Sequence, residues 1–466
     1  MDLPEAVLAP FRPTSELIEA LRALSWRSLP GDVRVRAKDL VLDHLGVALY
    51  GARFDWCRIV RTVALKEGDA DSPSSIYGGG RTSARNAALA NATAAHAVSL
   101  DDTHDEALSH PGSVIIPAAI AVAEQHNCSG DDFLAAVVAG YEAQCRFGLA
   151  LGKRLLERGF HPTAQLGIFG AAATAGYLLR FQQREFESAF GLAGSMASGI
   201  TKYLRDPEGT MVKRLHAGMP AERGLLAASL AAEGFTGPRG VIEGEDGFAN
   251  ILANERDLTR ITSDLGKRFE ILHVTVKFYS CHRMFHSLID AAVACRRDAA
   301  VSLDDIIEIE AYGPAAMAEG HMERRPKSLT SAQYSVPYTV ALALQSDPTR
   351  PELFDPGATG HLNLTAIMDK IVVKTAPDLE AIYPAKLAGR VRLKTRTGLI
   401  ERTVLDSHGT PARPVAASDI ERKFRVLTAD VLSQSQQDAV ADAVTRLDEA
   451  PDLSPLMRTL TSGGPA

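Results

Sequence analysis

One polar stretch of the chain has the residue types of an acid–base site. The segment HAVSLDDTHDEALSHPG, residues 96–112, contains three histidines and four acidic side chains. Histidine changes charge near neutral pH, and a neighbouring carboxylate can orient it or stabilise its proton. His110, with Asp101 or Asp102, is therefore the first candidate group. The alternative is a solvated loop whose acids cap the following helix.

Two further segments place basic groups beside tightly packed helices. In FHPTAQLG, His161 stands just ahead of a helix, where it could act as an acid or base or be a structural histidine. In GTMVKRLHAGMPAERG, the cationic and imidazole groups Lys213, Arg214 and His216 precede several small residues. Cations held against a close-packed helix suit an anionic ligand, since a desolvated cation gains strongly from a carboxylate. A surface Lys–Arg pair is the alternative.

The remaining candidates lie further along the chain. VKFYSCHRMFH places Lys277 near the junction of two predicted domains, where small ligands commonly bind. In SAQYSVPYTVALAL, Ser335 and Tyr338 begin a helix and could donate hydrogen bonds. His282 and His286, one helical turn apart, are the only pair with the geometry of a metal site. Because no recognised metal-ligand spacing is present, we predict no metal ion.

These groups must be positioned by two kinds of secondary structure. From about residue 14 to about residue 270 the apolar residues follow helical spacing, which predicts an all-α domain over residues 1–274. Period-two alternation then predicts strands at about 305–312, 369–375, 389–397 and 400–405, with helices between them. The fold class is therefore mainly α: a large helical domain plus a smaller α+β lid over residues 275–415. The helices of residues 416–466 are expected to pack back on the first domain.

Composition and charge exclude several classes of function. The 466 residues carry a formal net charge of -7 without long basic runs, so neither nucleic acid nor a membrane surface is an expected partner. GGGRTSARN, residues 78–86, lacks the pattern of a phosphate-binding loop, which argues against nucleotide binding. The five cysteines are scattered, and the N-terminus has no basic region before its apolar residues. We expect a cytoplasmic protein.

The combined set of side chains fits a small polycarboxylate substrate. Removing a proton next to a carboxylate builds up negative charge, so an enzyme without a cofactor must surround the reacting carbon with fixed cations and hydrogen-bond donors. It also needs a base of suitable pKa close to that carbon. Histidines, lysines and a tyrosine from both domains would meet these needs.

Seven segments, in order along the chain, resemble landmarks of the MmgE/PrpD family. They are NATAAHAVSLDDTH…SHPGSVIIPAAIAVAE, GYEAQCRFG, GFHPTAQLGIFGAAATAGYLL, AFGLAGSMASGI, KRLHAGMPAERGLLAASLAAEGFTGPRGVIEG, VKFYSCHRMFHSLIDA and AQYSVPYTVALAL. The family includes 2-methylcitrate dehydratase, cis-aconitate decarboxylase and iminodisuccinate epimerase. The resemblance implies a large all-α domain with an α+β lid, usually as a homodimer, and no metal or organic cofactor.

The resemblance also implies which residues act. Carried over position by position, the landmarks are Asp101, Asp102, Thr103, His110, His161, Lys213, Lys277 and Tyr338. We expect His110 and His161 to move protons, Asp101 to orient a histidine, and Tyr338 to act as donor or acid. Asp102, Thr103, Lys213, Arg214, His216, Lys277 and Ser335 are expected to bind substrate. Ser99 and Phe278 depart from the family pattern, in which an acid and a proline are frequent.

The predicted reaction is dehydration of a 2-methylcitrate-like hydroxy acid by a lyase that needs no cofactor. An epimerase or a decarboxylase of the same fold remains an alternative, because it needs the same carbanion chemistry. A protein that binds a polycarboxylate without catalysis is the third reading.

Overall fold

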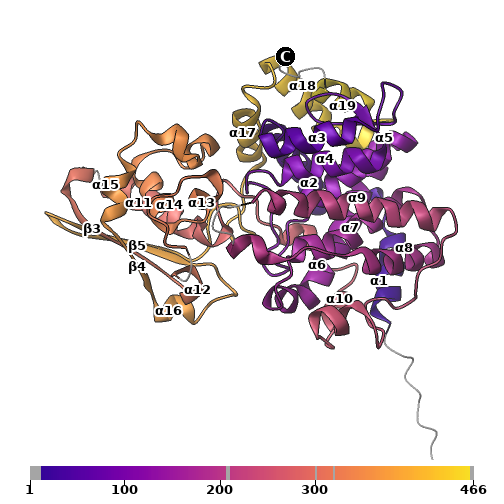
Figure 1. Cartoon of the computed structure of the whole chain (residues 1–466), viewed down its shortest axis with the longest axis horizontal. Coiled ribbons are helices and arrows are strands. Elements are labelled where there is room, and N and C mark those ends of the chain that lie inside the picture. The colour runs from indigo at the N-terminus through magenta and orange to yellow at the C-terminus, as the bar shows by residue number, and fades with distance from the viewer. Residues whose placement is uncertain (1–11, 206–209, 300–301, 319–320, 462–466) are drawn as a thin grey trace, which may run out of the picture.

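The structure, a computed structural model, describes residues 12–205, 210–299, 302–318 and 321–461. Figure 1 shows two parts side by side: a helical body, formed by α1 to α10, and an α+β unit, formed by α11 to α16 and β3 to β6. Helices far outnumber strands in both length and count. The predicted fold class, mainly α with a smaller α+β part, is confirmed.

The helical body contains ten helices and one short hairpin in the described residues. The helices are α1 (Pro13–Ala23), α2 (Gly31–Gly51), α3 (Asp55–Leu65), α4 (Ala84–Ala95), α5 (Gly112–His126), α6 (Gly130–Glu157), α7 (Pro162–Leu178), α8 (Gln183–Met196), α9 (Val212–Ala232) and α10 (Thr259–Thr262). The hairpin pairs β1 (Ser74–Ser75) with β2 (Arg81–Thr82), an exception to the all-α prediction for this part. In the described ranges no helix has the length and apolar character needed to cross a bilayer.

The centre of the helical body is α7, which is buried along its whole length. It packs against α5, α6, α8 and α9. Small residues permit this close packing: a Cβ atom added to Gly224 of α9 would lie 2.5 Å from the Cβ of Ala171 and 2.7 Å from the carbonyl of Ile168. The alanine- and glycine-rich segments therefore form buried helices because larger side chains would force these backbones apart.

The α+β unit is a four-stranded sheet covered by helices. Its strands are β3 (Ile306–Gly313), β4 (Ile371–Thr375), β5 (Gly389–Thr395) and β6 (Gly398–Val404), in the order β4-β3-β5-β6. The β3–β4 pair is parallel and the other two pairs are antiparallel. The helices are α11 (His286–Ala299), α12 (Ala315–Ala318), α13 (Leu329–Gln333), α14 (Val336–Gln345), α15 (Leu364–Asp369) and α16 (Pro377–Glu380).

After the sheet the chain returns to the helical body. The C-terminal helices α17 (Ala417–Thr428), α18 (Gln434–Thr445) and α19 (Ser454–Thr461) lie beside α2 and α3 in Figure 1. Helix α17 packs on α2, where Lys423 and Asp43 form a buried ion pair of 2.6 Å. The residue numbers at which the sequence divides the chain into domains stay a prediction.

Candidate active site

A cavity of about 340 Å³ lies where the helical body meets the α+β unit. The helical body contributes Ser99, Thr103, Asp105, Leu108, His110, Leu156, His161, Pro162, Tyr203, Leu204 and Lys213 to its lining. The chain from residue 277 onward contributes Lys277, Cys281, His282, Arg283, Met284, His321, Tyr334, Tyr383, Pro384 and Leu387. The structure therefore brings His110, His161, Lys213, Lys277 and Thr103 together in one wall, although they are far apart in the sequence.

Hydrogen bonds of the backbone hold the polar loop, residues 96–111, against the rest of the site. Helix α4 ends at Ala95 and α5 begins at Gly112, so the intervening loop carries the acid–base candidates. Thr103 pairs with Thr275 through two backbone hydrogen bonds of 2.7 and 3.0 Å. The backbone N–H of His110 donates to the hydroxyl of Thr163, at the start of α7. The loop is thus fixed on both sides, and most of it is buried, although Glu106 and Leu108 are exposed.

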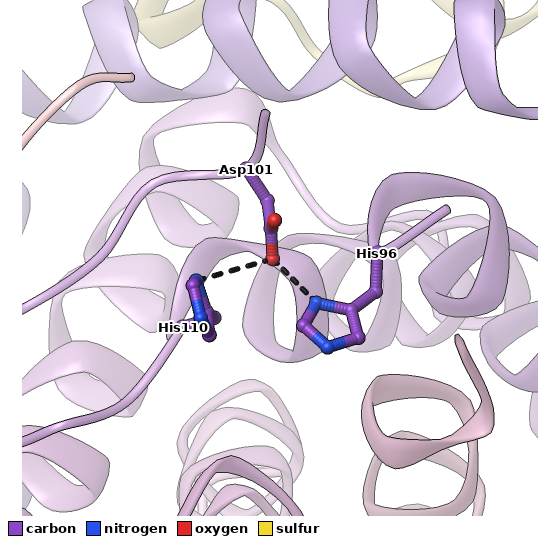
Figure 2. A group of neighbouring side chains, drawn as sticks. All are labelled: His96, Asp101 and His110. Carbon is purple, nitrogen blue, oxygen red and sulfur yellow. Dashed lines mark hydrogen bonds and ion pairs between the residues drawn. The ribbon is translucent and has the colours of Figure 1, made fainter. Parts of the chain in front are cut away.

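Asp101 connects two histidines at the centre of this loop (Figure 2). Its Oδ2 atom lies 2.6 Å from Nδ1 of His96 and 3.5 Å from Nδ1 of His110. Burial alone would raise the pKa of Asp101, but the adjacent histidines and Lys277 hold this pKa well below its usual value. Asp101 is therefore a carboxylate. Its other oxygen, Oδ1, is buried and has no hydrogen-bond partner in the described part of the chain.

The hydrogen bonds of His110 determine which ring nitrogen is free. Nδ1 of His110 lies 2.8 Å from the carbonyl oxygen of Asp102, and a carbonyl can only accept. Nδ1 must therefore carry the proton. Burial lowers the pKa of His110 to about 4, against the opposing effect of Asp101, so the ring is neutral near pH 7. The remaining nitrogen, Nε2, then has a lone pair and can act as a base.

The same hydrogen bonds bear on metal binding. One ligand atom each from His96, Asp101 and His110 lies within 4.8 Å of the others, a spacing at which a metal ion could be held. Nδ1 of His110 donates to the carbonyl of Asp102 in this arrangement, so only Nε2 of this ring could bind a metal ion. The pair singled out from the sequence does not converge, because His282 lines the cavity whereas the ring of His286 packs on Tyr279. We keep the prediction that no metal is involved.

Two buried lysines bring positive charge to the cavity. Burial, and next the charge of Arg214, lower the pKa of Lys213 to about 7. Burial lowers the pKa of Lys277 to about 8, although Asp101 favours its charged form. Nζ of Lys213 lies 3.3 Å from Nε2 of His96, so Lys213, His96, Asp101 and His110 form one connected network. At neutral pH each lysine can both bind an anion and exchange a proton.

His161 forms a second histidine pair, with His216, close to the first network: its ring centroid lies 6.0 Å from that of His96. It precedes the first turn of α7, and its Nδ1 lies 3.0 Å from Nδ1 of His216 on α9. One of these nitrogens donates and the other accepts. Burial, and next the proximity of His216, lower the pKa of His161 well below its usual value. His161 faces the cavity, while His216 lies behind it as the partner of its ring.

Six of the predicted site residues do not line the cavity: Asp101 and His216, described above, and Asp102, Ser335, Tyr338 and Arg214. The carboxylate of Asp102 accepts hydrogen bonds from Tyr141 and from the backbone of Gly112, and burial raises the pKa of Asp102 to about 7. The hydroxyl of Ser335 caps α14. The hydroxyl of Tyr338 donates to the carbonyl of Leu353 at 2.8 Å, within the α+β unit. Arg214 is buried behind the wall.

Several residues in the cavity wall, and His96 directly behind it, were not singled out from the sequence. His96 belongs to the polar stretch itself and directly follows α4, a position from which it can reach both the loop and α9. His321 and Tyr334 stack around His282, with ring centroids 5.4 and 5.2 Å from it. No signal in the sequence distinguishes Tyr334 from Tyr338, because both flank Ser335.

Fold and site together define a general class: a two-part, mainly α-helical protein with a cavity between its parts that contains lysine and histidine side chains. Comparison with protein families makes this specific. The N-terminal domain model of MmgE/PrpD matches residues 15–261, and the C-terminal domain model matches residues 279–449. The chain therefore belongs to the MmgE/PrpD family, as the sequence motifs predicted.

Similar proteins of known name match nearly the whole chain. A cis-aconitate decarboxylase-like protein, oryM, of Aspergillus oryzae is 29% identical and is matched over 96% of this chain and 97% of its own length. Cis-aconitate decarboxylase of Aspergillus terreus is 27% identical over 96% of this chain and 95% of its own. Cis-aconitate decarboxylase of Homo sapiens is 27% identical over 97% and 95%.

Proposed function

We propose that this protein is a lyase that acts on a small tricarboxylate and needs no cofactor, with cis-aconitate decarboxylation as the leading reaction. The carrying observation is the placement of Lys213, Lys277, His110 and His161 around one cavity. Relatives with cis-aconitate decarboxylase in their names, similar over the whole chain, favour decarboxylation over the 2-methylcitrate dehydration expected from the sequence.

The charge of the cavity supports a polyanionic substrate. Lys213 and Lys277 are buried cations, and a ligand carboxylate would offset the cost of their desolvation. Each ammonium group can hold one carboxylate of the substrate. Because both lysines are buried, these interactions are stronger than the same pairs at the protein surface.

The proton chemistry follows from the pKa values. In decarboxylation the carbon–carbon bond to one carboxylate breaks, CO2 leaves, and the remaining electron pair takes up a proton. Burial places the pKa of Lys213 at about 7, so its ammonium group can supply that proton at neutral pH. His161, next to His216, is the second candidate donor because the pair can pass a proton between their rings.

Dehydration is the second candidate, and one observation favours it. His110 is neutral with Nε2 unprotonated, the form that a base needs to remove a proton next to a carboxylate. Loss of the neighbouring hydroxyl would then release one water. Asp101 would hold the histidine in this tautomer in either reaction.

Proton NMR with purified protein separates these reactions. cis-Aconitate and 2-methylcitrate are each incubated with the enzyme, and products, CO2 release and solvent proton exchange are followed. We expect decarboxylation of cis-aconitate, and we expect His161→Ala to lower kcat by about 100-fold or more. His126, exposed at the end of α5, provides the control: His126→Ala should retain turnover.

The proposal fails if no carboxylate in the test is converted, or if His161→Ala and Lys213→Ala both keep near wild-type turnover. Binding of a tricarboxylate without any conversion would instead indicate a non-catalytic binding protein.

A further inference from the structure

Arg214 is a buried cation with only neutral partners. It is 2% exposed, and its guanidinium donates to the hydroxyl of Ser99 at 3.4 Å and to Thr330 and Gln333, each at 3.2 Å. Its positive charge also lies over the ring of Trp56. No carboxylate among the described residues lies within ion-pair distance of it. A buried charge without a counter-charge costs several kcal/mol, so this site favours an anion supplied from outside.

Ser99 connects this charge to the cavity. It lines the cavity wall, and its oxygen accepts from Arg214. In the part of the chain that the structure describes, the Ser99 hydroxyl donates to no partner, so its proton is free for a ligand. A guanidinium on the oxygen makes the hydroxyl a stronger donor, because hydrogen bonds in a chain polarise one another.

Arg214 and Lys213 serve different parts of the wall although they are adjacent in sequence. Successive residues of an α-helix point about 100° apart. Accordingly, Lys213 reaches His96, while Arg214 reaches Ser99 and the α+β unit through Gln333. The lining also contains Arg283, but Asp105 neutralises it at 2.8 Å. Arg214, behind Ser99, therefore adds a third positive charge without a carboxylate partner, beyond the two lysines.

We propose that Ser99 and Arg214 form an anion subsite that takes the third carboxylate of the substrate and makes the cavity selective for tricarboxylates over dicarboxylates. The inference rests on the proposed function, since it assumes that Lys213 and Lys277 hold the other two carboxylates. It assigns Ser99 as a specificity-determining residue, with Arg214 acting through it.

Two substitutions at Ser99 differ in charge alone. Ser99 has a left-handed backbone, with φ of 57°, a conformation that Asn and Asp adopt more readily than other non-glycine residues. Ser99→Asp places a carboxylate beside Arg214 and neutralises the subsite from within. Ser99→Asn is nearly the same size, stays neutral and can still donate a hydrogen bond.

Calorimetry with two unreactive probes tests the subsite without any need for turnover. Propane-1,2,3-tricarboxylate and glutarate differ only by the central carboxylate. We expect the wild type and Ser99→Asn to bind the tricarboxylate at least about tenfold more tightly than glutarate. Ser99→Asp should lose this preference and should also have a higher Tm than Ser99→Asn, because Arg214 gains a buried partner.

The proposal is overturned if the wild type binds both probes equally or neither of them. It is also overturned if Ser99→Asp keeps the preference for the tricarboxylate. A failure of the proposed function is recognised separately, since absence of conversion of cis-aconitate leaves these binding ratios unaffected.

Discussion

Replacing Lys213 by methionine tests whether the cavity holds its cations at the expense of stability. Lys213 is 5% exposed, and burial lowers its pKa from 10.5 to about 7. Between these two values the unfolded chain binds more protons than the folded one, so stability rises with pH in that range. Each unit of difference in pKa corresponds to about 1.4 kcal/mol.

The size of the effect follows from these values. Burying the Lys213 side chain costs the folded state about 5 kcal/mol at about pH 6 and about 2 kcal/mol at about pH 9. Methionine is similar in length and carries no charge. An unfolding entropy of about 2.1 cal/mol/K per residue amounts to about 1 kcal/mol/K for 466 residues. Lys213→Met should therefore raise Tm by about 3 °C more at about pH 6 than at about pH 9.

The difference between the two pH values isolates the charge. His96 loses a hydrogen-bond partner in the variant. Burial, the largest of the causes that lower the pKa of His96, remains, so we expect His96 to stay neutral and this loss to be the same at both pH values. Lys153, whose side chain is 74% exposed, gives the matched control, and Lys153→Met should show no such dependence. Thermal unfolding by circular dichroism measures both. A Tm gain for Lys213→Met that is equal at the two pH values, or larger at high pH, would refute the conclusion that Lys213 is desolvated in the folded state.

Two further predictions concern the pH dependence of turnover and the C-terminal helices. Burial lowers the pKa of His110 to about 4, of Lys213 to about 7 and of Lys277 to about 8, so kcat/KM should fall below about pH 4, as the base is protonated, and above about pH 7 to 8, as the cations are lost. A kcat/KM that stays constant below about pH 4 and above about pH 8 contradicts those roles. Lys423→Met leaves Asp43 buried without its partner and should lower the free energy of unfolding by about 3–5 kcal/mol. Adding Asp43→Asn should recover most of that loss in the same denaturation assay, and no recovery would mean that the pair is not the cause.

The sheet could be predicted from the sequence because its pattern is local. In β5 every second residue of Gly389–Thr395 is buried, and all four predicted strands are found within about three residues of their expected ends. The β1–β2 hairpin was not predicted, since two residues per strand are too few to show a period. The helices were predictable for the same reason, because their apolar residues also recur with a regular local period.

The site was only partly predictable, because residue types indicate the chemistry of a site but not where each side chain points. Ser335 and Tyr338 begin α14 as predicted, yet the hydroxyl of Tyr338 binds a carbonyl of its own unit while Tyr334 reaches the cavity. Only three residues lie between these tyrosines. Tyr334 directly follows α13, whereas Tyr338 lies in the first turn of α14, and this difference decides which side chain reaches the cavity. His96 was missed because its importance comes from contacts with Lys213 and Asp101, which are made by tertiary packing.

The backbone around Lys277 determines how the two parts of the molecule can move. Thr275 is paired with Thr103, and the N–H of Val276 donates to the carbonyl of Gly409 at 3.0 Å. A Cβ atom at residue 409 would lie 2.0 Å from the carbonyl oxygen of Val276, so glycine is required for this approach. Lys277 is therefore fixed to the loop that carries Asp101 and His110, although it introduces the α+β unit. Ser280, Gln333 and Arg283 are fixed to the same loop, because the first two donate to the carbonyl of Val98 and Arg283 pairs with Asp105 at 2.8 Å. If the cavity opens to admit substrate, we expect these residues and Lys277 to stay with the helical body and the displacement to begin beyond them.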